Sequence, residues 1–164
     1  MDKNMNGQNQ EEVLKLENCA YSLKLSRVKE ADFPYTGKAI TCTSELVDFA
    51  KMLSSADNEH FVGVYLDNGN KIICIHNIEG VVNQAVVYPR DVLRRALLIN
   101  ASAMVLIHNH PSGNVSPSDA DIKLTRTIQD CAKIPNILIH DHIIIGGGNE
   151  KVFSMRDEGI LNSN

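Results

Sequence analysis

The stretch that decides the fold is AMVLIHNHPSGNVSPSDAD, residues 103–121. Its first part, residues 103–107, is apolar without polar interruption, which predicts a central strand covered on both faces. The following HNHPSGNVSPSD is dense in turn formers and predicts a loop. A helix is then expected from about Ser118 to Lys133, with Pro135 to end it. The stretch therefore predicts a strand, a loop and a helix in direct succession.

Two histidines and an aspartate in this stretch can converge on one metal ion. Side chains two apart on a strand point the same way, so His108 and His110 can present both imidazoles to one point at the exit of the strand. The loop reverses the chain and delivers Asp121 in the first turn of the helix. Nitrogen and oxygen ligands favour zinc, with manganese, iron and cobalt as alternatives. Three protein ligands leave a fourth position for water, as in catalytic zinc sites.

Each part of this pattern also has a purely structural interpretation. Ser118 and Asp121 have the spacing of a capping box, and the helix dipole favours an aspartate near a helix start. A second His-x-His, His140 and His142, lies in a β-rich stretch. Strand histidines are more often packed or hydrogen-bonded than metal-bound, although one of this pair could lie near the pocket. Only the first pair precedes a turn and a helix-opening serine, so we expect the metal there.

The flanking sequence completes an α/β domain, a mixed sheet with helices against it. On the amino-terminal side we expect a helix that begins at Thr43 or Ser44, a hairpin of strands 60–66 and 71–76 around Asn68-Gly69, a strand 84–88 and a helix from Pro89 to Asn100. On the carboxyl-terminal side we expect a strand 137–145, a Gly146–Gly148 turn and a short strand 151–154.

Length and composition restrict the class of protein. A chain of 164 residues suits one hydrophobic core. The net charge of -4 gives no general attraction to nucleic acid. Because no run of 18 apolar residues and no signal-peptide pattern is present, we expect a cytoplasmic protein without membrane contact. The four cysteines form no Cys-x-x-Cys pair, which predicts structural thiols.

The domain organisation follows the composition along the chain. Residues 1–12 are rich in Asn, Gln and charge, which predicts a disordered tail. Residues 13–39 alternate weakly between apolar and polar and are expected to be an amino-terminal extension. Residues 40–164 carry the strong patterns and are expected to form the folded domain.

The motif resembles that of a known family. His108-x-His110-Pro111, six residues, Ser118, two residues and Asp121 resembles the JAMM motif in the version carried by RadC-type proteins. The resemblance covers about residues 40–162 and includes Glu59-His60-Phe61, Leu66-Asp67, Tyr88-Pro89-Arg90-Asp91 and Asp141-His142 through Gly146. It implies the MPN/JAB fold, a three-layer architecture like that of cytidine deaminase. It further implies a zinc-dependent peptidase or isopeptidase site with one zinc per chain.

The resemblance also assigns roles to two residues outside the ligand set. Glu59 matches the family's upstream glutamate, which implies a general base, and Glu79 is the rival carboxylate. Ser118 resembles the serine that stabilises an oxyanion. Gly80-Val81 departs from the Gly-Thr frequent in the family.

Two other classes of function stay open. In the first, the metal only fixes the loop and the domain is a binding module for a protein or peptide partner. In the second, the protein serves DNA repair or mobile elements, the label often attached to RadC-like proteins. Arg90, Arg94 and Arg95 are the one tight basic cluster, although arginines on a helix surface are commonly just solvated. The helix-hairpin-helix region of longer RadC proteins is not expected here, which weakens the DNA interpretation.

Overall fold

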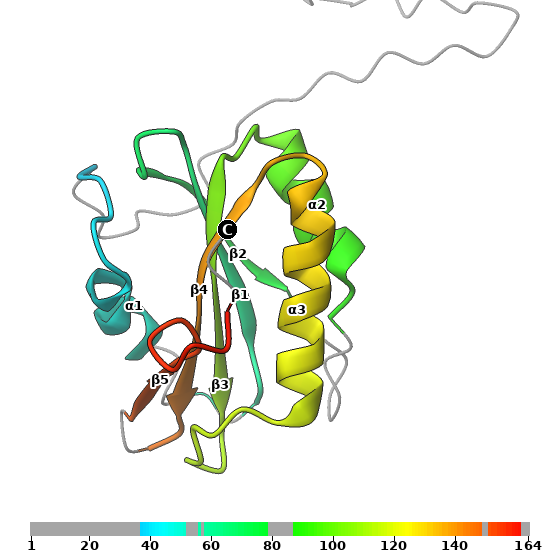
Figure 1. The fold of residues 1–164 in the computed structure, drawn as a ribbon. Helices are drawn as coiled ribbons and strands as arrows, with labels where there is room; N and C mark the ends of the chain where they lie inside the picture. Colours follow the sequence, from blue (N-terminus) through cyan, green and yellow to red (C-terminus); the bar gives the residue numbers. More distant parts are fainter. Residues whose placement is uncertain (1–36, 52–55, 57, 79–86, 149–150, 162–164) are drawn as a thin grey trace, which may run out of the picture. The chain divides into compact units, whose positions relative to one another are not determined.

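A five-stranded mixed sheet forms the centre of the unit that spans residues 33–164, with helices on both of its faces (Figure 1). The structure is a computed structural model that describes residues 37–51, 56, 58–78, 87–148 and 151–161. Its elements are a 3-10 helix η1 (Thr43–Leu46), α1 (Val47–Lys51), β1 (Phe61–Leu66), β2 (Ile72–Ile78), α2 (Pro89–Leu98), β3 (Ala103–His110), α3 (Asp119–Lys133), β4 (Leu138–Gly146) and β5 (Val152–Ser154). The expected fold class is confirmed.

The strand order is β2-β1-β3-β4-β5. β3 and β4 pair in parallel, and every other neighbouring pair is antiparallel. A parallel pair needs a crossover connection, and α3 supplies it between β3 and β4. The carboxyl-terminal end of β3 therefore lies directly beside the start of α3, where the metal site is expected.

The β1–β2 hairpin forms as predicted. The Asp67 carboxylate accepts hydrogen bonds from the amides of Gly69 (2.8 Å) and Lys71 (2.9 Å), which closes the turn. Asn70 has a φ of 56°, a left-handed conformation that asparagine tolerates better than most residues. The second strand runs from Ile72 to Ile78 and so extends beyond its predicted end.

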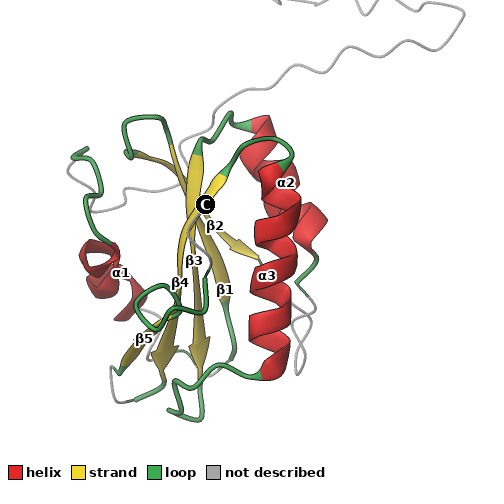
Figure 2. Ribbon diagram, in the orientation of Figure 1, coloured by secondary structure: helices red, strands yellow, loops and turns green. Residues whose placement is uncertain are grey.

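Side chains of β3 alternate between two hydrophobic cores, one on each face of the sheet. Met104 and Leu106 pack in the cluster that contains Ile128 of α3, on the face covered by α2 and α3 (Figure 2). Val105 and Ile107 pack in the other cluster, on the face covered by α1. The buried apolar run thus forms the central strand that the sequence predicted.

Two predicted boundaries are wrong. Of the strand expected at 84–88, residues 84–86 lie outside the described residues, and Val87 and Tyr88 are in no strand. Tyr88 is instead the extended N-cap of α2, because Pro89 disfavours helical geometry in the residue before it. β3 does not end at Ile107 but continues to His110, because its parallel pairing with β4 continues as far as Gly146.

Other expectations can be checked only in part. The tail 1–12 and residues 13–36 of the extension lie outside the described residues, as does Cys19. Cys74 and Cys131 are free thiols. In the part of the chain that the structure describes, no helix has the length and apolarity to cross a membrane.

Candidate metal centre

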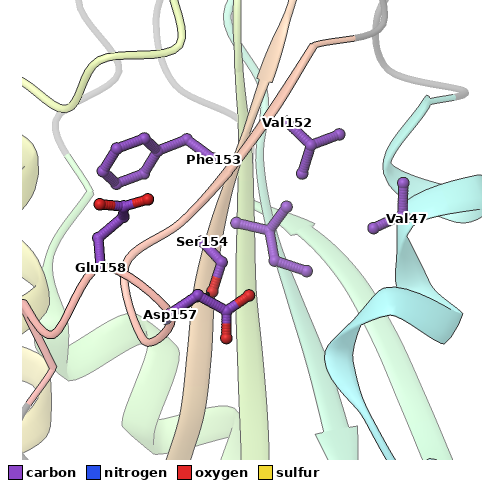
Figure 3. A pocket seen from close by; sticks show the side chains of 7 residues that line it. Val47, Val152, Phe153, Ser154, Asp157 and Glu158 are labelled. Atoms are coloured by element: carbon purple, nitrogen blue, oxygen red, sulfur yellow. Dashed lines mark hydrogen bonds between the residues drawn. The ribbon is translucent and has the colours of Figure 1, made fainter.

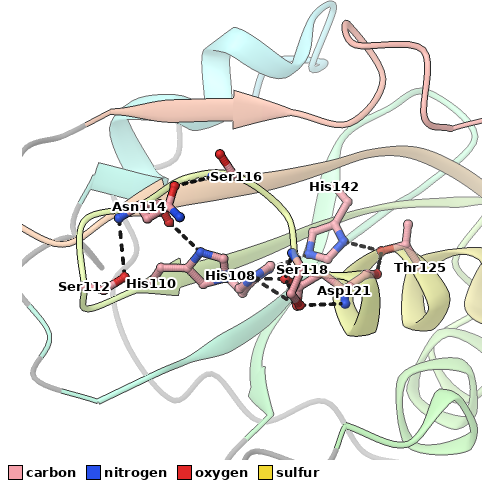
Figure 4. A network of polar contacts seen from close by, with 9 residues as sticks. All are labelled: His108, His110, Ser112, Asn114, Ser116, Ser118, Asp121, Thr125 and His142. Carbon is pink, nitrogen blue, oxygen red and sulfur yellow. Dashed lines mark hydrogen bonds and ion pairs between the residues drawn. The ribbon is translucent and has the colours of Figure 1, made fainter.

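The two histidines of the motif lie at the end of β3 and point to the same side of the strand (Figure 4). Their Nε2 atoms are 2.8 Å apart. His108 is 1% exposed and stacks on the ring of Phe61, whereas His110 is partly exposed at the mouth of the site. The structure therefore brings together the two imidazoles that the sequence singled out.

The loop after β3 fixes the tautomer of His110. Its Nδ1 lies 2.6 Å from the backbone carbonyl oxygen of Asn114. A carbonyl can only accept, so Nδ1 carries the proton and donates it, and Nε2 is left with a lone pair in the neutral ring. The loop is held in this shape by a hydrogen bond from the amide of Gly113 to the carbonyl of His110 (3.0 Å).

Asp121 reaches the histidines from the first turn of α3. Its Oδ2 accepts hydrogen bonds from the amide (2.7 Å) and the hydroxyl (2.6 Å) of Ser118, and the Ser118 Oγ accepts from the Asp121 amide. Its Oδ1 lies 3.5 Å from the Nε2 of His108. Its Oδ2 also lies 3.5 Å from the Nε2 of His110. The capping interpretation and the site interpretation are thus compatible, because the carboxylate that accepts from Ser118 also lies beside both histidines.

Glu59 joins this group from the segment before β1. Its side chain is exposed, and one ligand atom from each of Glu59, His108, His110 and Asp121 lies within 4.8 Å of the others. The structure thus places the predicted base beside the predicted ligands. The rival carboxylate, Glu79, lies outside the described residues.

Asn109 fastens the segment that carries Glu59. Its carboxamide oxygen accepts from the His60 amide (2.7 Å), and its carboxamide nitrogen donates to the Asn58 carbonyl (3.0 Å). The residues on either side of Glu59 are therefore both bound to one buried side chain. Sequence reasoning gave Asn109 no role, since it points away from its histidine neighbours, and a partner about fifty residues away leaves no local signal.

Burial and charge set the protonation of the centre. Burial lowers the pKa of His108 to about 4. The pKa of His110 is raised, chiefly by its hydrogen bond with Asp121. Burial alone would raise the pKa of Asp121, but its interactions with His110 and Ser118 outweigh this effect and hold that pKa well below its usual range. At neutral pH the centre therefore contains a neutral His108 ring and an ionised Asp121 carboxylate.

These donors fit a divalent cation. The Nδ1 of His110 is committed to a carbonyl, so its Nε2 lone pair faces the carboxylate oxygens of Asp121 and Glu59. Acceptors that converge in this way repel one another unless a cation or a proton lies among them. Two imidazole nitrogens with carboxylate oxygens, in a group without thiolate, are a donor set of catalytic zinc sites.

The second His-x-His does not form a site of its own. His142 is buried beneath the first pair, with its Nε2 2.7 Å from the Nδ1 of His108. His140 lies elsewhere and contacts the Asn70 side chain of the hairpin turn (3.1 Å). The expectation that one of the two lies near the pocket holds for His142.

A separate pocket lies beside β5 at the edge of the sheet (Figure 3). It has a volume of about 220 Å³ and is lined in part by Val47, Ile143, Val152 and Ser154. None of the described residues that line this pocket belongs to the histidine site.

The basic cluster on α2 is partly neutralised. Arg94 pairs with Asp91 at 3.2 Å, and the Nε of Arg90 lies 3.9 Å from the same carboxylate. The Arg90 guanidinium also stacks over the ring of Tyr88. These contacts of Arg90 and Arg94 are typical of solvated helix-surface arginines.

Comparison with known proteins agrees with this geometry. Residues 40–160 match the family described as RadC-like JAB domain. The chain belongs to this family. Among the relatives of this RadC-like JAB domain, the UPF0758 protein YkfG of Escherichia coli (strain K12) is 36% identical over 127 residues, which make up 76% of this chain and 79% of that protein.

Two further relatives are longer. A UPF0758 protein of Rhodobacter capsulatus is 36% identical over 153 residues, 92% of this chain and 68% of that protein. A UPF0758 protein of Photobacterium profundum is 39% identical over 113 residues, 68% of this chain and 50% of that protein. The part of this RadC-like JAB domain that matches the last relative thus spans only half of that protein's length.

Proposed function

We propose that the protein is a zinc-dependent hydrolase of the JAMM metallopeptidase type, which cleaves a peptide or isopeptide bond. One observation carries the proposal. Ligand atoms of two histidines, an aspartate and a glutamate from three separate segments lie within 4.8 Å of one another. Family membership supports it, because the range that matches the RadC-like JAB domain, residues 40–160, contains all four of these residues.

In this proposal one zinc ion per chain is held by the Nε2 atoms of His108 and His110 and by the carboxylate of Asp121. Asp121 has an oxygen available for this, because Ser118 occupies only its Oδ2. When bound, zinc supplies a water nucleophile at neutral pH by lowering the pKa of that water from about 15.7 toward 7.

Glu59 acts as the general base. Its carboxylate lies beside the three ligands and is exposed, so it can reach both solvent and a substrate. It takes the proton of the attacking water and hands it to the leaving amine. Asn109 holds the backbone on both sides of Glu59, which keeps this carboxylate at the site.

Ser118 is proposed to stabilise the oxyanion that develops at the substrate carbonyl. In the structure its hydroxyl donates to Asp121. A hydroxyl rotates about a single bond, so the same proton can turn to the developing charge. Ser118→Ala would then lower turnover and also weaken the helix cap.

Glu59→Gln tests the proposal because it removes the base and keeps the shape of the side chain. We expect zinc content to stay at one per chain and turnover to fall about 100-fold to 10,000-fold, the contribution of a general base. Zinc is measured by mass spectrometry, and turnover with a panel of fluorogenic peptides and isopeptide-linked substrates.

Glu158→Gln is the matched control, because it makes the same change at an exposed carboxylate that lines the separate pocket beside β5. It should keep both zinc and turnover. Unchanged turnover in Glu59→Gln would remove Glu59 from the mechanism, and loss of zinc would make Glu59 a ligand. A zinc-loaded wild-type protein that cleaves no member of the panel would favour the binding module.

A further inference from the structure

A relay of hydrogen bonds runs beneath the metal site and joins two of its candidate ligands (Figure 4). The Nδ1 of His108 lies 2.7 Å from the Nε2 of His142, and the Nδ1 of His142 lies 2.5 Å from the Oγ1 of Thr125. The Thr125 hydroxyl in turn donates to the backbone carbonyl of Asp121 at 2.6 Å. The relay therefore begins at one candidate ligand and ends at another.

The donor and acceptor of each hydrogen bond can be deduced by starting from the Asp121 carbonyl, at the end of the relay. The Asp121 carbonyl has only lone pairs, so the single hydroxyl proton of Thr125 goes to it. The Thr125 oxygen must then accept from the Nδ1–H of His142. A neutral His142 with its proton on Nδ1 has a lone pair on Nε2, and that lone pair accepts from the Nδ1–H of His108.

Solvent cannot replace any member of this relay. The exposed fraction is 1% for His108 and 0% for both His142 and Thr125. A buried imidazole N–H without an acceptor is destabilising, so the arrangement with every proton donated is preferred. Phe61 closes the site further, since its ring stacks on His108 and meets His142 edge-on.

This direction leaves the Nε2 of His108 without a proton. That atom is the one that faces His110 (2.8 Å) and Asp121 (3.5 Å). If the relay ran in the opposite direction, His142 would donate to His108 and force the His108 proton onto Nε2, where it would block a metal ion.

We infer that Thr125 and His142 are positioning residues that hold His108 in its metal-binding tautomer. The inference rests on the proposed function, since it concerns the same site. Groups that accept the second N–H of a ligating histidine are worth about 10-fold to 100-fold in metal affinity. Here His142 accepts this N–H directly, and Thr125 acts on His108 through the His142 ring.

Thr125→Val tests the inference, because valine keeps the shape of threonine and lacks the hydroxyl. His142 then loses its acceptor and shifts its proton to Nε2, which places a proton on the metal-facing nitrogen of His108. We expect the Kd for zinc, measured by competition with a chromophoric chelator, to rise about 10-fold to 100-fold. Thr125→Ser keeps the hydroxyl and should restore an affinity close to that of the wild-type protein.

Thr127→Val is the matched control. Thr127 lies on the same helix and donates to the backbone carbonyl of Lys123 at 2.8 Å, as Thr125 does to Asp121, but it is exposed. Its substitution should leave the Kd for zinc unchanged. An equal loss of affinity in the Thr125 and Thr127 variants would assign the effect to the helix and overturn the relay.

The tautomers can also be read directly in the wild-type protein, which keeps the inference testable if Thr125→Val does not fold. Nitrogen-15 NMR of the zinc-loaded protein should place the protons of His108 and His142 on Nδ1. A proton on the Nε2 of His142 would overturn the inference. A wild-type protein that binds no zinc would overturn the proposed function, whereas zinc binding unaffected by Thr125→Val would overturn the relay alone.

Discussion

The chain contains two His-x-His segments on neighbouring parallel strands, and they end in different environments. In His108-Asn109-His110 both imidazoles face one site, with Nε2 atoms 2.8 Å apart. In the second segment only His142 lies at that site, and His140 contacts the hairpin turn instead. The two segments have the same spacing in the sequence, but only the first places both of its histidines at the candidate metal site.

The difference lies in strand register. Met104 is opposite Ile139 on β4, and the next residue of β3, Val105, is opposite Asp141. His140 therefore has no partner on β3, and the bulge interrupts the alternation of side chains. Side chains two residues apart on a strand lie on the same face of the sheet only where the strand pairing is regular.

The middle residues of the two segments behave alike. Asn109 and Asp141 are both fully buried and both bind backbone from another segment. Asn109 holds the backbone around Glu59, and Asp141 accepts from the Ser154 hydroxyl (2.6 Å) and the Arg156 amide (3.0 Å). Asn109 therefore anchors the segment that carries the candidate base, and Asp141 anchors the carboxyl-terminal segment.

The largest expected effect separates the two histidine pairs. His108→Ala removes a ligand and should lower the zinc content of purified protein from one per chain to near none. His140→Ala removes a half-buried side chain outside the site and should keep it at one. Mass spectrometry of the native proteins measures both, and equal zinc contents would contradict the assignment.

A smaller effect distinguishes the two middle residues. Asn109→Ala releases the Glu59 segment, and a shift of about 1 Å in a catalytic group can cost about 100-fold in turnover, with zinc retained. Asp141→Ala should instead lower the free energy of unfolding by about 1–3 kcal/mol and lower turnover of the folded protein far less than Asn109→Ala does, because at the site Asp141 binds only the backbone amide of His142. Kinetics and chemical denaturation on both variants separate these outcomes. Similar turnover in the two would show that Asn109 does not position the base.

The smallest effect concerns Gly147, which follows β4 and donates its amide to the His110 carbonyl (2.8 Å). A Cβ there would lie 2.6 Å from the carbonyl oxygen of Pro111, so Gly147→Ala must displace the loop after His110. We expect an unfolding free energy lower by about 1–3 kcal/mol and a several-fold higher Kd for zinc. Gly69→Ala is the control, since its Cβ would meet only a side-chain oxygen at 3.3 Å. An unchanged Gly147→Ala protein would show that the loop tolerates the displacement.

Local patterns predicted much of the fold. The apolar run 103–107 gave the central strand, the Asn68-Gly69 turn gave the hairpin, and Ser118 gave the start of α3. The motif also selected His108, His110 and Asp121, which the structure gathers at one place, and the family resemblance added Glu59. Apart from Glu59, each of these features is encoded within a few neighbouring residues or in a motif of fixed spacing.

Contacts between distant segments could not be predicted. Three features depend on how strands and helices pack together: the β3–β4 bulge, the hydrogen bonds from Asn109 to the backbone around Glu59, and the relay through Thr125. Strand register in particular is set by pairing across the whole sheet. For the same reason the strand predicted from the sequence ended at Ile107, although β3 continues to His110 and contains both histidines. Supporting residues around a site are therefore harder to predict than the motif itself.

The candidate ligands and the relay all belong to one uninterrupted span, β3 through β4, whereas the candidate base arrives from the segment before β1. Under the proposed function, cation binding and chemical turnover are consequently encoded in separate parts of the gene. A single base change in a glutamate codon yields glutamine, so one mutational step would remove the proposed base and leave the proposed ion-holding scaffold intact.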